Sequence, residues 1–139
     1  MKRFVLDASV ALRWFIGRPV PAYAKRVKQF FLKGVRALVP ALWHLEMSNG
    51  LAVAERRSIL AITDVDQAII DIEQIVAQAV DTDSSVVSAR RSLTTARAFQ
   101  LSAYDAVYLD LARRERLALA TLDHRLRAAA AQAGVELLR

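Results

Sequence analysis

The sequence contains no cysteine, and glycine and proline are scarce, at four and three of 139 residues. Without cysteine, a disulfide framework, a thiolate zinc site and a cysteine nucleophile are all excluded, and a reducing compartment is expected. The few glycines and prolines leave little room for linkers or low-complexity segments. No apolar run reaches the ~18 residues that a membrane span needs. We therefore expect one cytoplasmic domain over residues 1–139, with no membrane segment.

The abundant residues are apolar and basic, with a hydrophobic content of 55% and a net charge of +6. This composition is typical of a globular domain with a substantial core. The positive charge comes from sixteen arginines and four lysines, and the planar guanidinium group suits phosphate recognition. Nucleic acid is therefore a candidate partner, although an arginine-rich genome composition would give the same basic surface.

Hydrophobic patterning predicts short buried strands that alternate with helices. Strands are expected at residues 4–6, 37–39, 117–121 and 135–138. Helices are expected at residues 8–15, 22–32, 41–57, 62–79, 84–99, 102–116 and 125–133. Residues 62–79 carry the clearest apolar stripe, with a spacing of three and four residues. Short apolar strands alternating with helices indicate a three-layer α/β/α sandwich with a mainly parallel central sheet.

Four acidic residues lie beside apolar sequence, close to the expected ends of strands and helices. Asp7 directly follows the apolar residues 4–6, where an ionised carboxylate is costly unless something pairs with it. Glu46, Asp105 and Asp123 have comparable positions at the starts of helices or the end of a strand. Ligands of parallel α/β sheets bind beyond the carboxyl ends of the strands, where all four acids are expected. Together they predict one acidic pocket for a hard divalent cation.

Each acid taken alone also has a structural explanation. The sequence Ser102-x-x-Asp105 is a capping box, in which the serine and the acid satisfy the first turn of a helix. Asp123 can cap the helix that follows it, and Glu46 can be a solvated helix residue. Asp7 is the hardest to explain in this way, because an acid at the end of a buried strand needs a partner.

Other catalytic chemistries find little support in the sequence. It has no glycine-rich phosphate loop, nucleophile elbow or Walker lysine. The two histidines, His44 and His124, lack the spacing of metal ligands and are expected at the surface. Metal-assisted hydrolysis is therefore the chemistry that the acids favour.

Four short segments, in this order and over a chain of this length, resemble the PIN-domain nucleases, especially the small VapC-type toxins. The matching segments are Phe4–Ser9, Glu46–Leu51, Leu101–Ala106 and Leu119–Asp123. The resemblance implies that an acidic quartet binds Mg²⁺ or Mn²⁺ and catalyses the reaction, namely Asp7, Glu46, Asp105 and Asp123. Asp7 and Asp105 are then the expected primary ligands, while the other two complete the pocket. The polar residues that accompany the quartet would be Ser9, Asn49 and Thr121.

The resemblance also implies an Mg²⁺-dependent endoribonuclease that hydrolyses RNA phosphodiester bonds. Such a protein would act as a homodimeric toxin, inhibited by a cognate VapB-like antitoxin. Two other functions stay open: a PIN-domain nuclease of RNA processing without a toxin role, and a non-catalytic nucleic-acid-binding module. The intact quartet argues against the second. Recognition of the RNA is expected from a basic rim, for which the candidates are Arg13, Arg18, Lys25 and Arg26.

Overall fold

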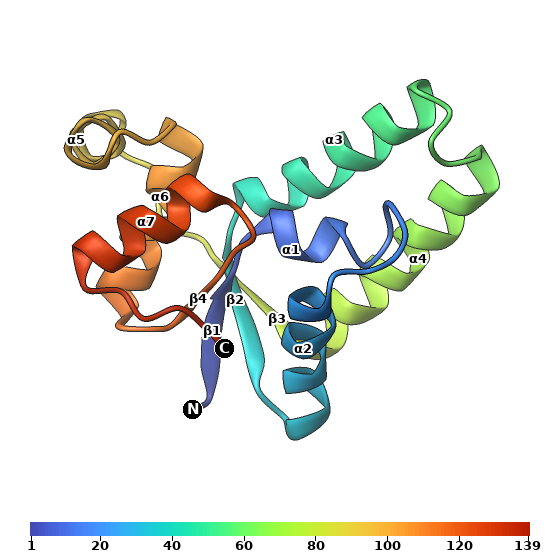
Figure 1. Cartoon of the computed structure of the whole chain (residues 1–139), viewed down its shortest axis with the longest axis horizontal. Coiled ribbons are helices and arrows are strands. Elements are labelled where there is room, and N and C mark those ends of the chain that lie inside the picture. The colour runs from blue at the N-terminus through green and yellow to red at the C-terminus, as the bar shows by residue number, and fades with distance from the viewer.

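A four-stranded sheet runs through the middle of the protein, with helices on both of its faces (Figure 1). The computed structural model describes all residues, 1–139. The strands are β1 (Arg3–Leu6), β2 (Arg36–Pro40), β3 (Val80–Asp83) and β4 (Leu119–Ala120). They are parallel and lie in the order β3-β2-β1-β4. The expected three-layer α/β/α sandwich with a parallel sheet is therefore confirmed.

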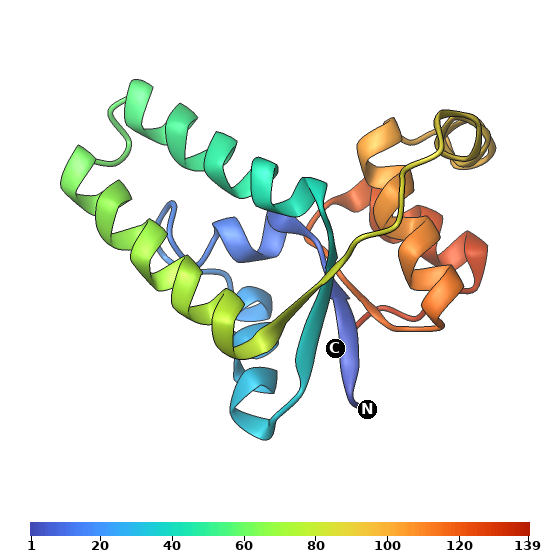
Figure 2. The same ribbon diagram turned by 180° about the vertical axis from the view of Figure 1, so that it is seen from behind.

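The helices divide between the two faces of the sheet, with α1 to α4 on one side and α5 to α7 on the other (Figure 1). Their bounds are α1 (Ala8–Leu12), α2 (Ala22–Gln29), α3 (Leu42–Arg56), α4 (Ile62–Ala79), α5 (Ala89–Phe99), α6 (Ala103–Glu115) and α7 (His124–Ala133). A 3-10 turn (Phe30–Lys33) follows α2. Figure 2 shows β3 leading the chain from α4 across to α5. None of these helices combines the length and the apolar character needed to cross a bilayer.

The core is centred on β1, which lies between β2 and β4. Phe4 pairs with Ala37 of β2, and Leu6 pairs with Ala120 of β4. All four side chains are fully buried, because a central strand of a parallel sheet is covered by helices on both faces. Burial of each large side chain stabilises the fold by about 1.5–3 kcal/mol. The apolar run before Asp7 is thus held rigidly, and Asp7 emerges from it at a fixed position.

A close approach of two helices on one face of the sheet depends on Gly50. A Cβ atom at Gly50 would lie 2.6 Å from Cδ2 of Leu12, so α3 and α1 pack without an intervening side chain. Asp7 lies one residue before α1, and Glu46 lies one turn before Gly50 on α3. The contact at Gly50 therefore brings the beginnings of both helices to the same side of the sheet.

The sequence-based boundaries were confirmed for some elements and wrong for others. The helix expected at 62–79 has the same bounds as α4. The helix expected from residue 84 begins only at Ala89, and the strand β3 before it was not predicted. The strand expected at 117–121 is reduced to two residues, and that at 135–138 to a single bridge between Leu119 and Leu137.

Charged residues explain why β3 escaped prediction. Asp81 and Asp83 resemble turn residues in the sequence, yet both find arginine partners in the fold. Arg36 of β2 donates to both carboxylate oxygens of Asp81 at 3.1 and 3.2 Å through its Nε. Arg114 of α6 lies 2.9 Å from Oδ1 of Asp83. An edge strand can carry acids when neighbouring elements supply the opposite charge.

Candidate functional site

Asp7 lies at the junction of β1 and α1 and is only 4% exposed. Asp7 occupies the N-cap position of α1, but its carboxylate makes no capping hydrogen bond to the backbone of that helix. Instead, the hydroxyls of Ser9 and Thr121 donate to its Oδ2 at 2.6 and 2.7 Å. The carboxylate is therefore fixed by two hydroxyls on one oxygen, which leaves Oδ1 without a hydroxyl donor.

The two hydroxyls are themselves oriented by backbone amides of the loop after β4. The Leu122 N–H donates to Ser9 Oγ at 3.0 Å, and the Asp123 N–H donates to Thr121 Oγ1 at 3.1 Å. With these acceptor positions filled, both hydroxyl protons are free to point at Asp7. The same network joins the end of β1 to the loop that carries Asp123.

The other three acids reach this region from three different helices. Glu46 lies in the second turn of α3, one turn later than the sequence suggested. Asp105 lies in the first turn of α6, where its backbone N–H donates to the Ser102 hydroxyl at 3.1 Å. This contact confirms the expected serine cap. Asp123 caps α7, since its Oδ1 accepts from the Leu126 N–H at 2.9 Å.

The pKa values of the acids show that they share one electrostatic neighbourhood. Burial, together with the charges of Asp7 and Asp123, raises the pKa of Asp105 to about 6. Burial also raises the pKa of Glu46, with Asp7 and Asp105 adding to the effect. The pKa of Asp7 is raised by burial and by Asp123, against the lowering effect of its two hydroxyl partners. Asp7, Glu46 and Asp105 thus each feel the charge of at least one other acid of the quartet.

The donor set fits a hard divalent cation, although the side chains do not form a closed ligand cage. As they stand, no three Asp, Glu or His side chains are close enough to hold a metal ion. Like charges in a partly buried site repel one another, and a bound cation would offset that repulsion. Carboxylate and hydroxyl oxygens are the ligand type that Mg²⁺ and Mn²⁺ prefer.

Tyr108 is a member of the site that the sequence did not assign. Its hydroxyl donates to Glu46 Oε1 at 2.6 Å, and its ring is fully buried. Burial and the nearby charges of Asp7 and Glu46 raise its pKa, so the phenol stays a neutral donor. The sequence feature that could have indicated Tyr108 was its position three residues after Asp105, which places both on the same face of α6.

Replacing Tyr108 with phenylalanine is expected to raise the pKa of Glu46, because the hydroxyl bond that lowers it is lost. Stability should fall by about 1 kcal/mol, the usual net contribution of one hydrogen bond. The Glu46 carboxyl titration, followed by NMR, measures the pKa directly. Tyr104→Phe is the matched control, since Tyr104 lies on the same helix and is 67% exposed. An unchanged Glu46 titration in Tyr108→Phe would contradict the assignment.

Two residues predicted from sequence have different surroundings in the structure. Asn49 is exposed on α3 and makes no hydrogen bond to any of the four acids. Arg13 binds its own loop, since its Nε donates to Ile16 O at 3.1 Å and its Nη2 to Pro19 O at 3.4 Å. It therefore holds the loop between α1 and α2.

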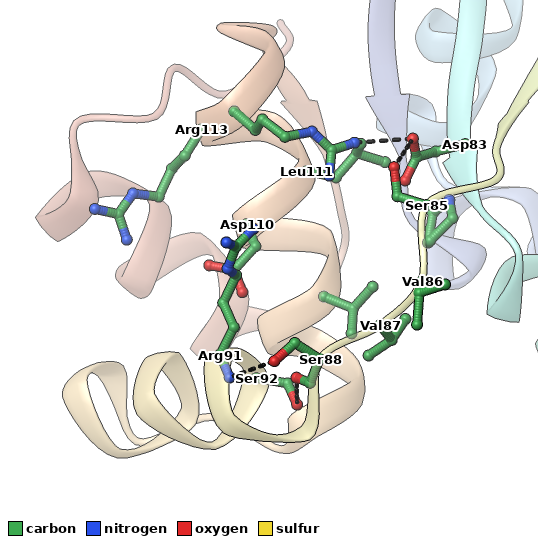
Figure 3. Close-up of a pocket in the computed structure, with 13 residues that line it drawn as sticks. Asp83, Ser85, Val86, Val87, Ser88, Arg91, Ser92, Asp110, Leu111 and Arg113 are labelled. Atoms are coloured by element: carbon green, nitrogen blue, oxygen red, sulfur yellow. Dashed lines mark hydrogen bonds and ion pairs between the residues drawn. The ribbon is translucent and has the colours of Figure 1, made fainter.

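A separate hollow of about 190 Å³ lies between the loop after β3 and helices α5 and α6 (Figure 3). None of the four acids lines it. Both of its acids have partners within the protein: Arg114 and the Ser85 hydroxyl bind Asp83 at 2.9 and 3.0 Å, and Thr95 donates to Asp110 at 2.8 Å. We interpret this hollow as a seam between elements, distinct from the acidic site.

The PIN domain family model matches residues 4–132 of the sequence. The chain belongs to the PIN domain family. In this PIN domain the match spans all four acids and all of the strand residues except Arg3. No curated protein matches the sequence.

Solved structures from several organisms are similar to this PIN domain. PAE2754 from Pyrobaculum aerophilum has a TM-score of 0.65 at 23% identity, covering 92% of this chain and 79% of that one. FitAcB from Neisseria gonorrhoeae has a TM-score of 0.66 at 18% identity, and the match covers 98% of this chain and 96% of that one. A toxin–antitoxin complex from Klebsiella pneumoniae has a TM-score of 0.55 at 18% identity, covering 86% of each chain. At these identities the similarity shows a shared fold.

Proposed function

We propose that this PIN domain is a divalent-metal-dependent endoribonuclease and the toxin of a VapBC-type toxin–antitoxin pair. PIN domains are generally nucleases. The observation that carries the proposal is the convergence of four acids from separate elements, with the pKa values of three of them raised by burial and by one another. Keeping like charges together in a folded protein costs free energy, which a bound cation offsets.

The residues of the site have distinct tasks in this proposal. Asp7 and Asp105 would be the main ligands of Mg²⁺ or Mn²⁺, while Glu46 and Asp123 complete the site and orient water. A cation held there supplies charge stabilisation for phosphodiester hydrolysis. Ser9 and Thr121 keep the Asp7 carboxylate in one orientation through hydroxyl bonds of 2.6 and 2.7 Å. Such fixed geometry lowers the reorganisation needed during the reaction.

The toxin role is supported by the family and by the kind of complex that one similar structure contains. The similar Klebsiella pneumoniae structure is a toxin–antitoxin complex. We infer by analogy that a VapB-like antitoxin binds this protein and that the toxin acts as a homodimer on RNA in the cytoplasm. Neutralisation of the cleavage activity by the product of an adjacent reading frame would distinguish a toxin from an RNA-processing nuclease.

The activity is tested by incubating the purified protein with total RNA in EDTA, and then with Mg²⁺ or Mn²⁺ added back. We expect no cleavage in EDTA and discrete fragments when either ion is present, because carboxylates alone cannot stabilise the developing charge on the phosphate. Fragments are resolved on denaturing gels and their ends mapped. Metal-independent cleavage would contradict the proposal, and RNA binding without cleavage would favour a non-catalytic binding module.

A further inference from the structure

Arginines surround a second surface hollow, of about 360 Å³, close to the acidic site. It is lined by Tyr23, Arg26, Arg127, Leu137, Leu138 and Arg139. Helices α2 and α7 and the C-terminal segment contribute these residues, and Figure 1 shows that segment between the two helices. Half of the lining side chains are arginines and none is acidic. We call this feature the arginine hollow.

Arg127 is held in place by two contacts that leave part of its guanidinium group available. Its Nε donates to Thr121 O at 2.8 Å. Its Cζ lies 4.6 Å from the centre of the Tyr23 ring, and the Tyr23 hydroxyl is fixed by donating to Leu138 O at 2.8 Å. A guanidinium group has five N–H donors in a planar fork. A side chain that is already ordered loses less entropy when it binds a ligand.

No acidic side chain pairs with the arginines of the arginine hollow, and the α-carboxylate of Arg139 can offset at most one of their three positive charges. The ion pairs of this structure use Arg3, Arg36 and Arg114, and none involves the hollow. Arg26 lies over the same Tyr23 ring as Arg127, with its Cζ 5.6 Å from the ring centre. Burial raises the pKa of Tyr23, so the phenol is neutral and adds no negative charge. An anion would relieve the repulsion between these arginines.

Thr121 lies between the arginine hollow and the acidic site. Its backbone oxygen accepts from Arg127, and its hydroxyl donates to Asp7 Oδ2 at 2.7 Å. Arg127 also lies one helical turn after Asp123, to whose backbone oxygen its N–H donates at 2.9 Å. Through Thr121, the arginine hollow therefore adjoins the acidic site, and both contact the segment between β4 and α7.

We propose that the arginine hollow binds a backbone phosphate of the RNA strand, next to the phosphate at the acidic site. The identity of the strand rests on the proposed ribonuclease function. Arginine binds phosphate through paired hydrogen bonds, and backbone contacts position a strand without reading its sequence. The hollow thus sets the affinity for RNA and the register of cleavage. An acidic segment of a partner protein is the competing occupant.

The proposal is tested by measuring RNA binding under conditions in which no metal is present and the RNA is not cleaved. Fluorescence anisotropy of a short labelled single-stranded RNA is measured with the Asp7→Asn protein in EDTA. Adding Arg127→Gln is expected to weaken binding about tenfold at moderate salt, and to reduce the slope of log K against log salt by about 0.7. That slope change is the value for one phosphate contact on a single strand.

Two further variants separate the hollow from general charge and from misfolding. Arg26→Gln combined with Arg139→Gln alters two exposed side chains of the hollow and should leave the fold intact while weakening binding similarly. Arg56→Gln combined with Arg57→Gln is the matched control, because these exposed arginines lie at the far end of α3 (Figure 1). The control should lose much less affinity.

The outcomes distinguish the hollow from the proposed activity. Equal losses in the hollow and control variants, or no loss in the hollow variants, would overturn the inference. Polyglutamate binding as tightly as RNA, with the same dependence on these arginines, would overturn it in favour of an acidic protein segment. If the wild-type protein does not cleave RNA but the hollow variants still lose binding selectively, the hollow stands and the nuclease proposal fails.

Discussion

Replacing Asp7 with asparagine is expected to lower the rate of RNA cleavage by about 10³-fold or more, while the protein remains folded. The substitution removes the negative charge but keeps a side-chain oxygen. That oxygen can still accept the hydroxyl bonds from Ser9 and Thr121, which now converge on Oδ2. Because burial and Asp123 raise the pKa of Asp7, loss of its charge is expected to cost the fold little stability. Loss of activity would therefore report loss of a metal ligand rather than loss of structure.

Cleavage is measured with Mg²⁺ at matched protein concentrations, and folding is checked by circular dichroism and thermal unfolding. Asp66→Asn is the matched control, since Asp66 is exposed on α4 far from the acidic site. It removes the same charge and should leave cleavage unchanged. A folded Asp7→Asn protein that cleaves RNA at the wild-type rate would remove Asp7 from the catalytic set.

Metal-free protein is expected to be more stable near about pH 5 than near about pH 7.5, opposite to the usual effect of ionised carboxylates. The pKa of Asp105 is about 6 in the folded protein, against 3.8 for an unperturbed side chain. Between these values the folded state binds more protons than the unfolded state, so the free energy of unfolding falls as pH rises. The full shift sets an upper limit of ~3 kcal/mol, which solvent screening reduces because Asp105 is only half-buried. It acts in the same direction as the raised pKa values of Asp7 and Glu46.

Urea unfolding in EDTA across this pH range measures the effect, and Asp105→Asn isolates its source. The variant should be more stable than wild type near about pH 7.5 and should show a flatter pH dependence. Asp81 does not interfere, because Arg36 lowers its pKa below 3.8 and its contribution is lost only in stronger acid. Mg²⁺ should stabilise the protein more near neutral pH, where the ligands are ionised. Stability that rises steadily from pH 5 to 7.5 in EDTA would contradict the raised pKa values.

Local patterns in the sequence were sufficient where a single element decides the outcome. The apolar stripe of residues 62–79 gave the bounds of α4, because one buried face at helical spacing specifies a helix without reference to its neighbours. They were insufficient for β3. Asp81 and Asp83 are tolerated in that strand only through Arg36 and Arg114, which come from other elements. Partners that are remote in the sequence leave no local signal.

The sequence by itself determined the layered α/β architecture and the chemical character of the site. Short apolar strands that alternate with helices specify a parallel sheet covered by helices. An acid at the end of an apolar strand needs a partner whatever the arrangement of the other elements. The catalytic roles of the four acids stay a prediction until the variants are measured.

The family resemblance had implied Ser9 and Thr121, but only the tertiary structure decided through which contacts side chains support the acids. Ser9 and Thr121, which are 112 residues apart, meet at Asp7. Tyr108 reaches Glu46 across 62 residues, and α2 and α7 form the arginine hollow at the C-terminal segment. These contacts follow from strand order and helix packing. Strand order and helix packing are properties of the whole chain, because the position of each element depends on the positions of the others.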